Sequence, residues 1–249
     1  MALTQVDAVV LRSFRFSEAD RIVHVLTPDM GRVAAIAKGS RKMKSRLAAF
    51  LEPGTRVHLT LARGRGELFT VAGADLLSSN SGLVADTPRF LCAQQGIEAA
   101  LRLSDDAGPS ERAYRLLCRY LDELHVGGPL PAGPSSTRQA VWLAYLAKLL
   151  YVSGLMPELS RCTAGGESDG LVAFSAQAGG ALCSACAVRH PDATAFGAAD
   201  ATLMRDLLGR PMAELRDLVP EAEAADRVAA ACVAVLTAHL GVRLRTVAA

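Results

Sequence analysis

Three cysteines in the second half of the chain have the spacing of a metal site. Cys183 and Cys186 form a Cys-x-x-Cys turn in a glycine-rich segment, and Cys162 lies upstream of them. A zinc ribbon holds one tetrahedral ion between two Cys-x-x-Cys turns. The gap between Cys162 and the turn at Cys183 and Cys186 matches that arrangement. The first turn is broken, however, because Gly165 stands where its second cysteine belongs.

Three thiolates alone do not complete such a site, because structural zinc takes four protein ligands. Only His190, which follows Cys186, or a carboxylate such as Glu167 is placed to supply the fourth. The competing interpretation is a metal-free loop in which His190 is an ordinary surface histidine. Zinc held by Cys162, Cys183, Cys186 and His190, and a loop without metal, are both open on the sequence.

The same cysteines do not fit a catalytic zinc site. Zinc deaminases place His-x-Glu upstream of Pro-Cys-x-x-Cys, but Leu182 precedes Cys183 and the chain has no His-x-Glu. It also has no P-loop and no Gly-x-Gly-x-x-Gly fingerprint. We therefore expect no enzyme and no nucleotide cofactor.

The strongest charge signal is the segment Lys38-Gly-Ser-Arg-Lys-Met-Lys-Ser-Arg46, which has five basic residues and no acidic one. Lysine and arginine there would neutralise phosphates without requiring a base sequence. The alternative is a solvated loop with a chance excess of charge. The predicted DNA contacts are Lys38, Arg41, Lys42, Lys44 and Arg46 in this segment, with Arg32 and Arg65 in or beside neighbouring turns.

The composition permits a sizeable core, but by itself it does not indicate a nucleic-acid partner. The chain has 249 residues, of which 51% are hydrophobic, and its formal net charge is only +2. Contact with nucleic acid must therefore come from local clustering of charge. No apolar run approaches the roughly 18 residues that span a bilayer, and the first residues, MALTQVDAVVLRSF, do not resemble a leader. We expect a cytoplasmic protein with reduced cysteines.

The elements that position these residues change character along the chain. Residues 1–80 contain short β-prone runs separated by turn residues, and the expected strands are 6–11, 21–27, 33–38, 57–62 and 67–72. Five such strands suggest a small closed barrel, for which the OB-fold is the commonest form. Aromatic stacking platforms are not evident, because Phe14, Phe16, Phe50 and Phe69 are the only aromatic residues in this region and some must fill the barrel.

Helical periodicity begins near Thr87, which we expect to cap the first helix, with Pro88 at its first position. That helix continues to residue 103, and further helices are expected at 109–125, 137–152, 199–209 and 221–241, with a Pro/Gly-rich linker at 127–136. The predicted fold class is α+β. A five-stranded OB-fold β-barrel over residues 1–80 precedes a helical domain over 81–249, which carries an inserted zinc-ribbon-like knuckle at about 158–192.

Several segments, in order along most of the chain, resemble the RecO family. They are Ala8-Val-Val-Leu-Arg12, Ser17-Glu-Ala-Asp-Arg-Ile-Val23, Leu26-Thr-Pro-Asp-Met-Gly-Arg32, Ala37-Lys-Gly-Ser-Arg-Lys-Met-Lys-Ser-Arg46, Leu51-Glu-Pro53, Ser153-Gly-Leu-Met-Pro-Glu-Leu159 and Gly179-Gly-Ala-Leu-Cys-Ser-Ala-Cys186. The last two resemble the family's approach to its zinc knuckle and the closure of that knuckle. Gly165 is the departure, and it bears on metal binding alone.

The resemblance implies a role in DNA repair and recombination. It implies an N-terminal OB-fold that binds single- and double-stranded DNA, a helical C-terminal domain, and partnership with RecR and single-stranded-DNA-binding protein near the nucleoid. It also implies annealing of complementary strands and loading of recombinase onto coated single strands. We expect the barrel to hold strands by their phosphates without reading bases.

Two alternatives belong to other classes of protein. One is an interaction scaffold whose barrel binds protein, and the other is an RNA-binding factor built from the same parts. A strong salt dependence of DNA affinity would exclude the scaffold, and competition between DNA and RNA would address the RNA-binding factor.

The resemblance further implies that the helical domain receives the acidic, apolar-ended tail of single-stranded-DNA-binding protein. Arg112, Arg115 and Arg119 share one face of a predicted helix beside Leu116 and Tyr120, and are the candidate contacts. The alternative is a solvated stripe on a surface helix.

Overall fold

The computed structural model describes residues 2–43, 45–64, 66, 68–79, 81–104, 109, 111–126, 140–241 and 244. The chain forms two compact units, Met1–His125 and Val126–Ala249. The unit boundary lies beyond the domain boundary that we expect at residue 80, because the first two long helices cluster with the barrel. The expected linker at 127–136 lies outside the described residues.

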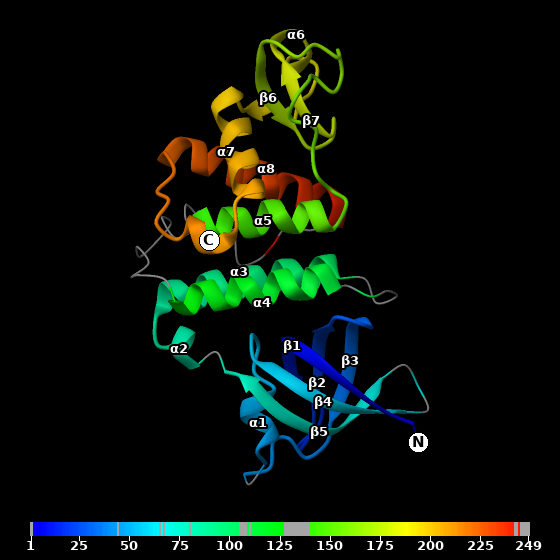
Figure 1. Ribbon diagram of the computed structural model, residues 1–249. Helices are drawn as coiled ribbons and strands as arrows, with labels where there is room; N and C mark the ends of the chain where they lie inside the picture. The colour runs from blue at the N-terminus through cyan, green and yellow to red at the C-terminus, as the bar shows by residue number, and fades with distance from the viewer. Residues whose placement is uncertain are drawn as a thin grey trace. The chain divides into compact units, whose positions relative to one another are not determined.

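The first unit contains β1 (Leu3–Arg15), β2 (Arg21–Thr27), β3 (Gly31–Ala37), α1 (Leu47–Phe50), β4 (Arg56–Arg63), β5 (Phe69–Ser78), α2 (Ser81–Val84), α3 (Thr87–Leu103) and α4 (Glu111–Val126) (Figure 1). Its strands form a closed barrel in the order β1-β2-β3-β5-β4. All neighbours are antiparallel except β3 and β5, which pair in parallel at Ala35 and Phe69 and at Ile36 and Thr70.

The first strand closes the barrel by pairing with two neighbours. Leu3 to Val9 pair with β4, and Val9 to Arg15 pair with β2, with a shift of register between Val10 and Arg12. For this reason β1 is longer than the expected strand at 6–11, and β5 likewise extends beyond residue 72 along β4. Both expected strands were too short, because pairing continues where the apolar pattern has ended.

The barrel interior is apolar because side chains alternate between the two faces of each strand. In β3 every second residue is buried, and Val33, Ala35 and Ala37 point inward with Val23 and Val25 of β2. The other buried side chains of this interior cluster are Val6, Ala8, Val10, Leu51, Val57, Leu59, Leu61 and Val71.

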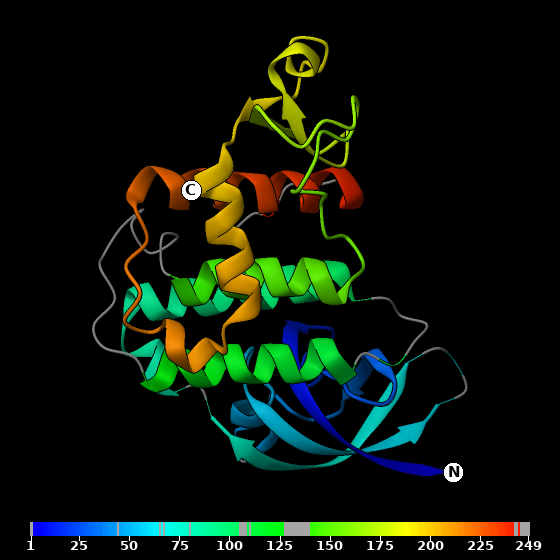
Figure 2. The ribbon, with the colours of Figure 1, turned by 45° about the horizontal axis from the view of Figure 1, so that its top comes forward.

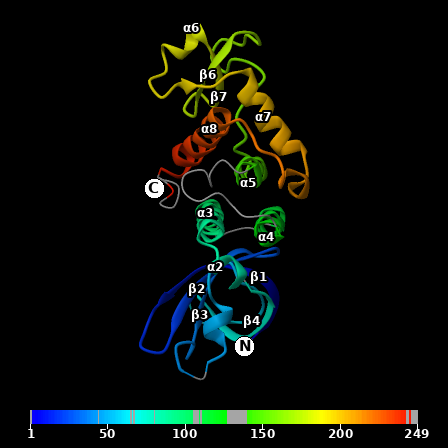
Figure 3. The ribbon, with the colours of Figure 1, turned by 90° about the vertical axis from the view of Figure 1, so that its left-hand side faces the viewer.

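Helices α3 and α4 lie side by side next to the barrel (Figures 1 and 3). The Tyr120 hydroxyl donates to the carbonyl of Cys92 at 2.8 Å and joins the two helices. Arg56 of β4 makes a bidentate ion pair with Asp122 of α4, with N···O distances of 2.7 and 3.1 Å. These polar contacts orient the helix pair on the strands.

The second unit contains α5 (Ala140–Val152), β6 (Leu171–Ser175), β7 (Gly180–Cys183), α6 (Ser184–Ala187), β8 (Thr194–Ala195), α7 (Ala198–Gly209), η2 (Met212–Leu215) and α8 (Ala222–Leu240). Helices α5, α7 and α8 pack on one another, and α7 crosses the other two (Figure 2). Buried Asp200 accepts hydrogen bonds from Arg227 at 2.9 and 3.0 Å, which tie α7 to α8. Strands β7, β6 and β8 form a small sheet in that order.

No helix in the described part of the chain is both long and apolar enough to cross a membrane.

Asp86, and not Thr87, caps α3. Its side chain accepts the backbone N–H of Arg89 at 3.1 Å, and Thr87 is the first helical residue, followed by Pro88. The expected cap was therefore one residue too late. A carboxylate suits this position because it also pairs with the guanidinium of Arg89 at 3.4 Å and complements the helix dipole.

We expect Asp86→Ala to lower the free energy of unfolding by about 1 kcal/mol, because the backbone N–H of Arg89 loses its acceptor and the ion pair with Arg89 is lost as well. Thr87→Ala is the matched control and should have little effect, since Thr87 is exposed. Urea unfolding followed by far-ultraviolet circular dichroism measures both variants. A larger loss in Thr87→Ala than in Asp86→Ala would contradict this assignment of the cap.

Candidate nucleic-acid interface and cysteine cluster

Two loops meet at one end of the barrel. Arg15 at the end of β1 pairs with Arg21 at the start of β2, and Arg21 pairs with Ala37 at the end of β3. The turn 16–20 and the segment 38–46, which we call the basic loop, therefore leave the barrel side by side.

Hydrogen bonds anchor the basic loop to this turn. The backbone N–H of Gly39 donates to the Asp20 carboxylate at 2.8 Å, and the N–H of Arg41 donates to the carbonyl of Ala19 at 2.9 Å. The Arg41 guanidinium also donates to the carbonyls of Ser17 and Glu18, at 2.8 and 2.7 Å. Gly39 has a φ of +65°, a conformation that side chains disfavour. Arg41 thus holds the loop in place through its backbone N–H and its Nη1 atom.

The other described cations of the loop are displayed to solvent. Lys38, Lys42 and Arg46 are exposed, and so is Met43 at the tip of the loop. Arg46 also immediately precedes α1. Lys44 lies outside the described residues, as does Arg65. The exposed members form a cationic edge whose backbone is held by the turn 16–20.

Arg32 lies away from this edge. It is near the start of β3, whereas Lys38 follows the end of that strand, which places them roughly 20 Å apart at the usual rise per residue. Its guanidinium donates to the carbonyl of Leu101 at the end of α3, at 3.3 Å. The structure therefore does not bring Arg32 together with the basic loop, and gives it a contact at a helix C-terminus, where a cation is favourable.

The three arginines proposed for partner binding are exposed on one face of α4. Arg115 pairs with Glu111 one turn earlier, at 2.6 Å. Leu116 and Tyr120, expected beside them, are buried. The arginine stripe is thus continuous in Arg112, Arg115 and Arg119, but these two apolar side chains do not share its exposed face.

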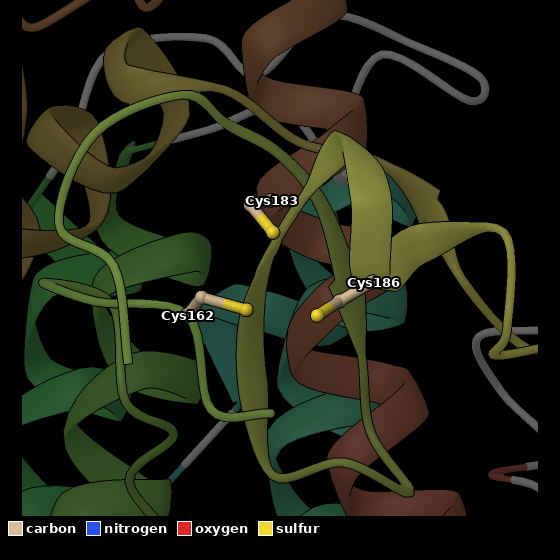
Figure 4. A group of neighbouring side chains, drawn as sticks. All are labelled: Cys162, Cys183 and Cys186. Carbon is tan, nitrogen blue, oxygen red and sulfur yellow. The ribbon is translucent and has the colours of Figure 1, made fainter. Parts of the chain in front are cut away.

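The cysteines at 162, 183 and 186 converge in the second unit. Their sulfur atoms all lie within 4.8 Å of one another, and the side chains point toward a common centre from a loop, the end of β7 and helix α6 (Figure 4). Cys162 and Cys186 are buried. Three sulfur ligands at this separation could bind a metal ion.

Local hydrogen bonds favour thiolate at Cys162. Its pKa is lowered to about 6, first by the backbone N–H of Cys183 and further by the N–H groups of Gly165 and Ala164, against the opposing effect of burial. The Gly165 N–H lies 3.3 Å from the Cys162 sulfur. Cys186 differs. Arg189 donates to its sulfur at 3.0 Å and lowers its pKa, but contacts with the neighbouring thiols and burial raise that pKa overall.

Neither expected fourth ligand is within 4.8 Å of all three sulfurs in the described structure. Burial raises the pKa of Asp192, but its hydrogen bonds with Gln177 and Ser175, and the nearby His190, lower that pKa overall. His190 is thus close enough to Asp192 to lower the pKa of that carboxyl group. The Glu167 carboxylate occupies the space that a Cβ at Gly165 would fill. A carboxylate therefore lies where the motif lacks its cysteine.

Sequence reasoning missed one group on the barrel surface. Phe14 and Phe16 do not belong to the barrel interior, and the Phe14 ring lies 5.8 Å from the His24 ring and 5.0 Å from the Arg12 guanidinium. The spacing Arg12, Phe14, Phe16 is the two-residue period of a strand face. That period was the available signal that these side chains share a surface.

Comparison with known proteins covers nearly the whole chain. Residues 1–80 match the family model for the Recombination protein O N terminal, and residues 84–248 match that for the Recombination protein O C terminal. A DNA repair protein RecO from Frankia casuarinae is 39% identical over 204 residues, covering 81% of this chain and 80% of the relative.

Two further proteins of that name show the same relation. The one from Anaeromyxobacter sp. strain K is 33% identical over 249 residues, covering 98% of this chain and 94% of the relative. The one from Rubrobacter xylanophilus is 36% identical over 218 residues, covering 86% and 84% respectively. The matches to both family models and to these relatives show that the chain belongs to the RecO family.

Proposed function

We propose that this protein acts in DNA repair and recombination as a non-enzymatic mediator that binds DNA through its barrel. The observation that carries the proposal is the anchored basic loop, in which Lys38, Lys42 and Arg46 are exposed on a backbone held by Arg41 and Gly39. Fixed cations at one barrel edge bind a phosphate chain and release its counterions. Family membership supports the same function.

We further assign the barrel to the OB-fold. Its order β1-β2-β3-β5-β4, closed between β1 and β4, is a five-stranded Greek-key arrangement. Barrels of this class bind oligonucleotides on the face of their second and third strands and on the adjoining loops. The turn 16–20 between β1 and β2 belongs to that binding region.

Phosphate contacts of this kind suit a protein that acts at any sequence. Two strands held by their backbones keep their base edges available for pairing, which supports annealing. Loading of recombinase would then require RecR and displacement of single-stranded-DNA-binding protein, and α4 offers an exposed cationic stripe for the acidic tail of the latter.

We propose that the cysteine cluster holds zinc as a structural crosslink of the second unit, with Glu167 in place of the missing cysteine. Three converging sulfurs and backbone N–H donors to Cys162 fit a metal-binding knuckle. The position of the Glu167 carboxylate against Gly165 favours it over His190 as fourth ligand. Zinc would join the loop at residue 162 to β7 and α6.

The DNA-binding proposal predicts a change in salt dependence. Lys38→Ala/Lys42→Ala should weaken binding to all oligonucleotide sequences alike, and should reduce the slope of log affinity against log salt by about 0.7 for each lost single-strand contact. Arg205→Ala/Arg210→Ala removes the same charge from two exposed arginines in α7 and at its C-terminal cap, and is the matched control. Fluorescence anisotropy over a salt series measures both variants. An equal change in the two would remove the basic loop from the proposal.

The mediator function predicts faster annealing of complementary oligonucleotides, both free and coated with single-stranded-DNA-binding protein. The loop variant should lose most of this acceleration, while the α7 control keeps it, because annealing requires both strands to be held. Strand pairing is followed with a fluorophore and a quencher on the two oligonucleotides. No acceleration by the folded wild-type protein would refute annealing.

The zinc proposal predicts one zinc ion per chain, measured by elemental analysis of protein purified without chelators. Cys183→Ser should lose the metal and lower the melting temperature, since the crosslink is removed. Glu167→Ala should weaken zinc retention against a chelator, whereas His190→Ala should not. Gly165→Cys should strengthen it, because four thiolates are then present.

A reversed result for Glu167→Ala and His190→Ala would make the histidine the fourth ligand. Metal-free wild-type protein with the same melting temperature after zinc is added would refute the zinc site.

The docking proposal predicts that a peptide with the acidic, apolar-ended tail binds the cationic stripe of α4. Arg115→Glu should reduce its affinity on the order of tenfold, because an attractive charge contact with the acidic tail is replaced by repulsion. Arg205→Glu is the control for charge alone. Isothermal titration with the tail peptide measures both, and wild-type affinity in Arg115→Glu would locate the tail elsewhere.

A further inference from the structure

The outer face of β1, β2 and β3 carries an unusual set of side chains. Register places Arg12 opposite His24 and Phe14 opposite Ile22. On the other side of β2, His24 lies opposite Ala34 and Ile22 lies opposite Ile36. Because directly opposed residues share a face, these side chains form one surface, separate from the barrel interior.

Helix α3 covers only one end of this outer face. Val9 and Leu26, which pair across β1 and β2, are fully buried although they lie outside the interior cluster. Arg32, opposite Leu26 on β3, reaches the carbonyl of Leu101 in α3, and α3 packs against β1. At the other end of the face, toward the turn 16–20 and the basic loop, Arg12 and Phe16 are exposed and Phe14 is half-buried.

Flat side chains are displayed at that open end. Phe16 is 58% exposed, although a large aromatic side chain is normally used to build a core. Two residues earlier, the Phe14 ring lies near both the Arg12 guanidinium, 5.0 Å from its ring centre, and the tilted His24 ring at 5.8 Å. Arg12, Phe14 and His24 thus form a cluster of flat side chains, and Phe16 lies two residues beyond Phe14, toward the turn.

The charge of this surface is cationic. Its strand positions Arg12, Phe14, Ile22, His24 and Ile36 include no carboxylate, and Lys38 follows β3 at the same end. Glu18 and Asp20 belong to the adjoining turn, where Asp20 accepts the N–H of Gly39. Planar apolar groups bordered by cations complement a ligand that alternates flat rings with anions, which is the chemistry of a single-stranded nucleic acid.

We propose that Phe16, with the Arg12–Phe14–His24 cluster behind it, is a base-stacking platform for single-stranded DNA whose phosphates run along the basic loop. The inference rests on the proposed DNA binding and deepens it, because bases as well as phosphates are then held. A duplex keeps its base faces stacked internally, so Phe16 contributes to single-strand binding and not to duplex binding. Stacking accepts every base, which preserves sequence independence.

Affinity measurements on the protein distinguish contacts with bases from contacts with phosphates. Phe16→Ala should lower affinity for a single-stranded oligonucleotide on the order of tenfold, leave duplex affinity and the salt slope unchanged, and abolish the preference of the wild type for an intact over an abasic oligonucleotide. Phe16→Tyr should retain wild-type affinity. Leu77→Ala is the matched control, because Leu77 is 53% exposed on β5 of the same barrel.

Three outcomes would overturn the platform: unchanged single-strand affinity in Phe16→Ala, an equal loss for duplex, or an equal loss in Leu77→Ala. Failure of the proposed function is distinguishable, because it would appear as wild-type protein that binds neither strand form, or as an unchanged salt slope in the basic-loop variant.

A Phe16→Trp variant reports on stacking directly. The single native tryptophan, Trp142, is fully buried in the second unit, so a new signal comes from position 16. Its fluorescence should be quenched by a single-stranded oligonucleotide and not by an abasic strand or a duplex bound to the same extent. Single-strand binding without quenching, or equal quenching by the abasic strand, would show that position 16 does not stack on bases.

Discussion

Closure of the barrel by β1 is the constraint on which the first unit depends. One continuous strand pairs with β4 along its first half and with β2 along its second half, so each of the five strands β1 to β5 has two neighbours. Closure also requires β3 and β5 to meet in parallel. The ends of β1 and β3 and the start of β2 are thereby brought to one end of the barrel, where the basic loop and the turn 16–20 meet.

Some basic residues of the first unit bridge elements of the protein, and others are exposed. Arg41, Arg32 and Arg56 each use a guanidinium to bridge elements of the protein, respectively at a turn, a helix end and a helix face. A planar fork with several donors suits such bridging better than an ammonium group does. Lys38 and Lys42 remain exposed. The arginines that bridge elements are thus distinct from the exposed cations of the basic loop, which include Arg46.

The geometry of the cysteine cluster is set by the main chain. The backbone N–H of Gly165 donates to the Cys162 sulfur, and the Glu167 carboxylate lies in the space beside Gly165. The backbone hydrogen bond from Thr163 to Ala181 of β7 brings the segment of Cys162 next to the strand that ends at Cys183.

Local pattern was enough to predict the family resemblance, the α+β class, the order of the five barrel strands and the longer helices, and the grouping of three cysteines. These properties depend on apolar periodicity, turn residues and short motifs, which are all local features of the sequence. The basic loop was predicted as a charged segment between strands for the same reason, and the structure displays Lys38, Lys42 and Arg46 as expected.

Only the tertiary structure decided which of these residues are exposed and which are held by contacts within the protein. In the sequence, Arg32 and Arg41 are basic residues like Lys42, and nothing local distinguishes them. In the structure, Arg32 contacts Leu101 and Arg41 contacts the turn 16–20, and both partners are distant in the sequence. The same holds for Phe14, whose place outside the barrel follows from the register of β1 against β2, and for Phe16, which follows the end of β1. Strand pairing and helix coverage are long-range interactions, so one sequence specifies them only through the completed fold.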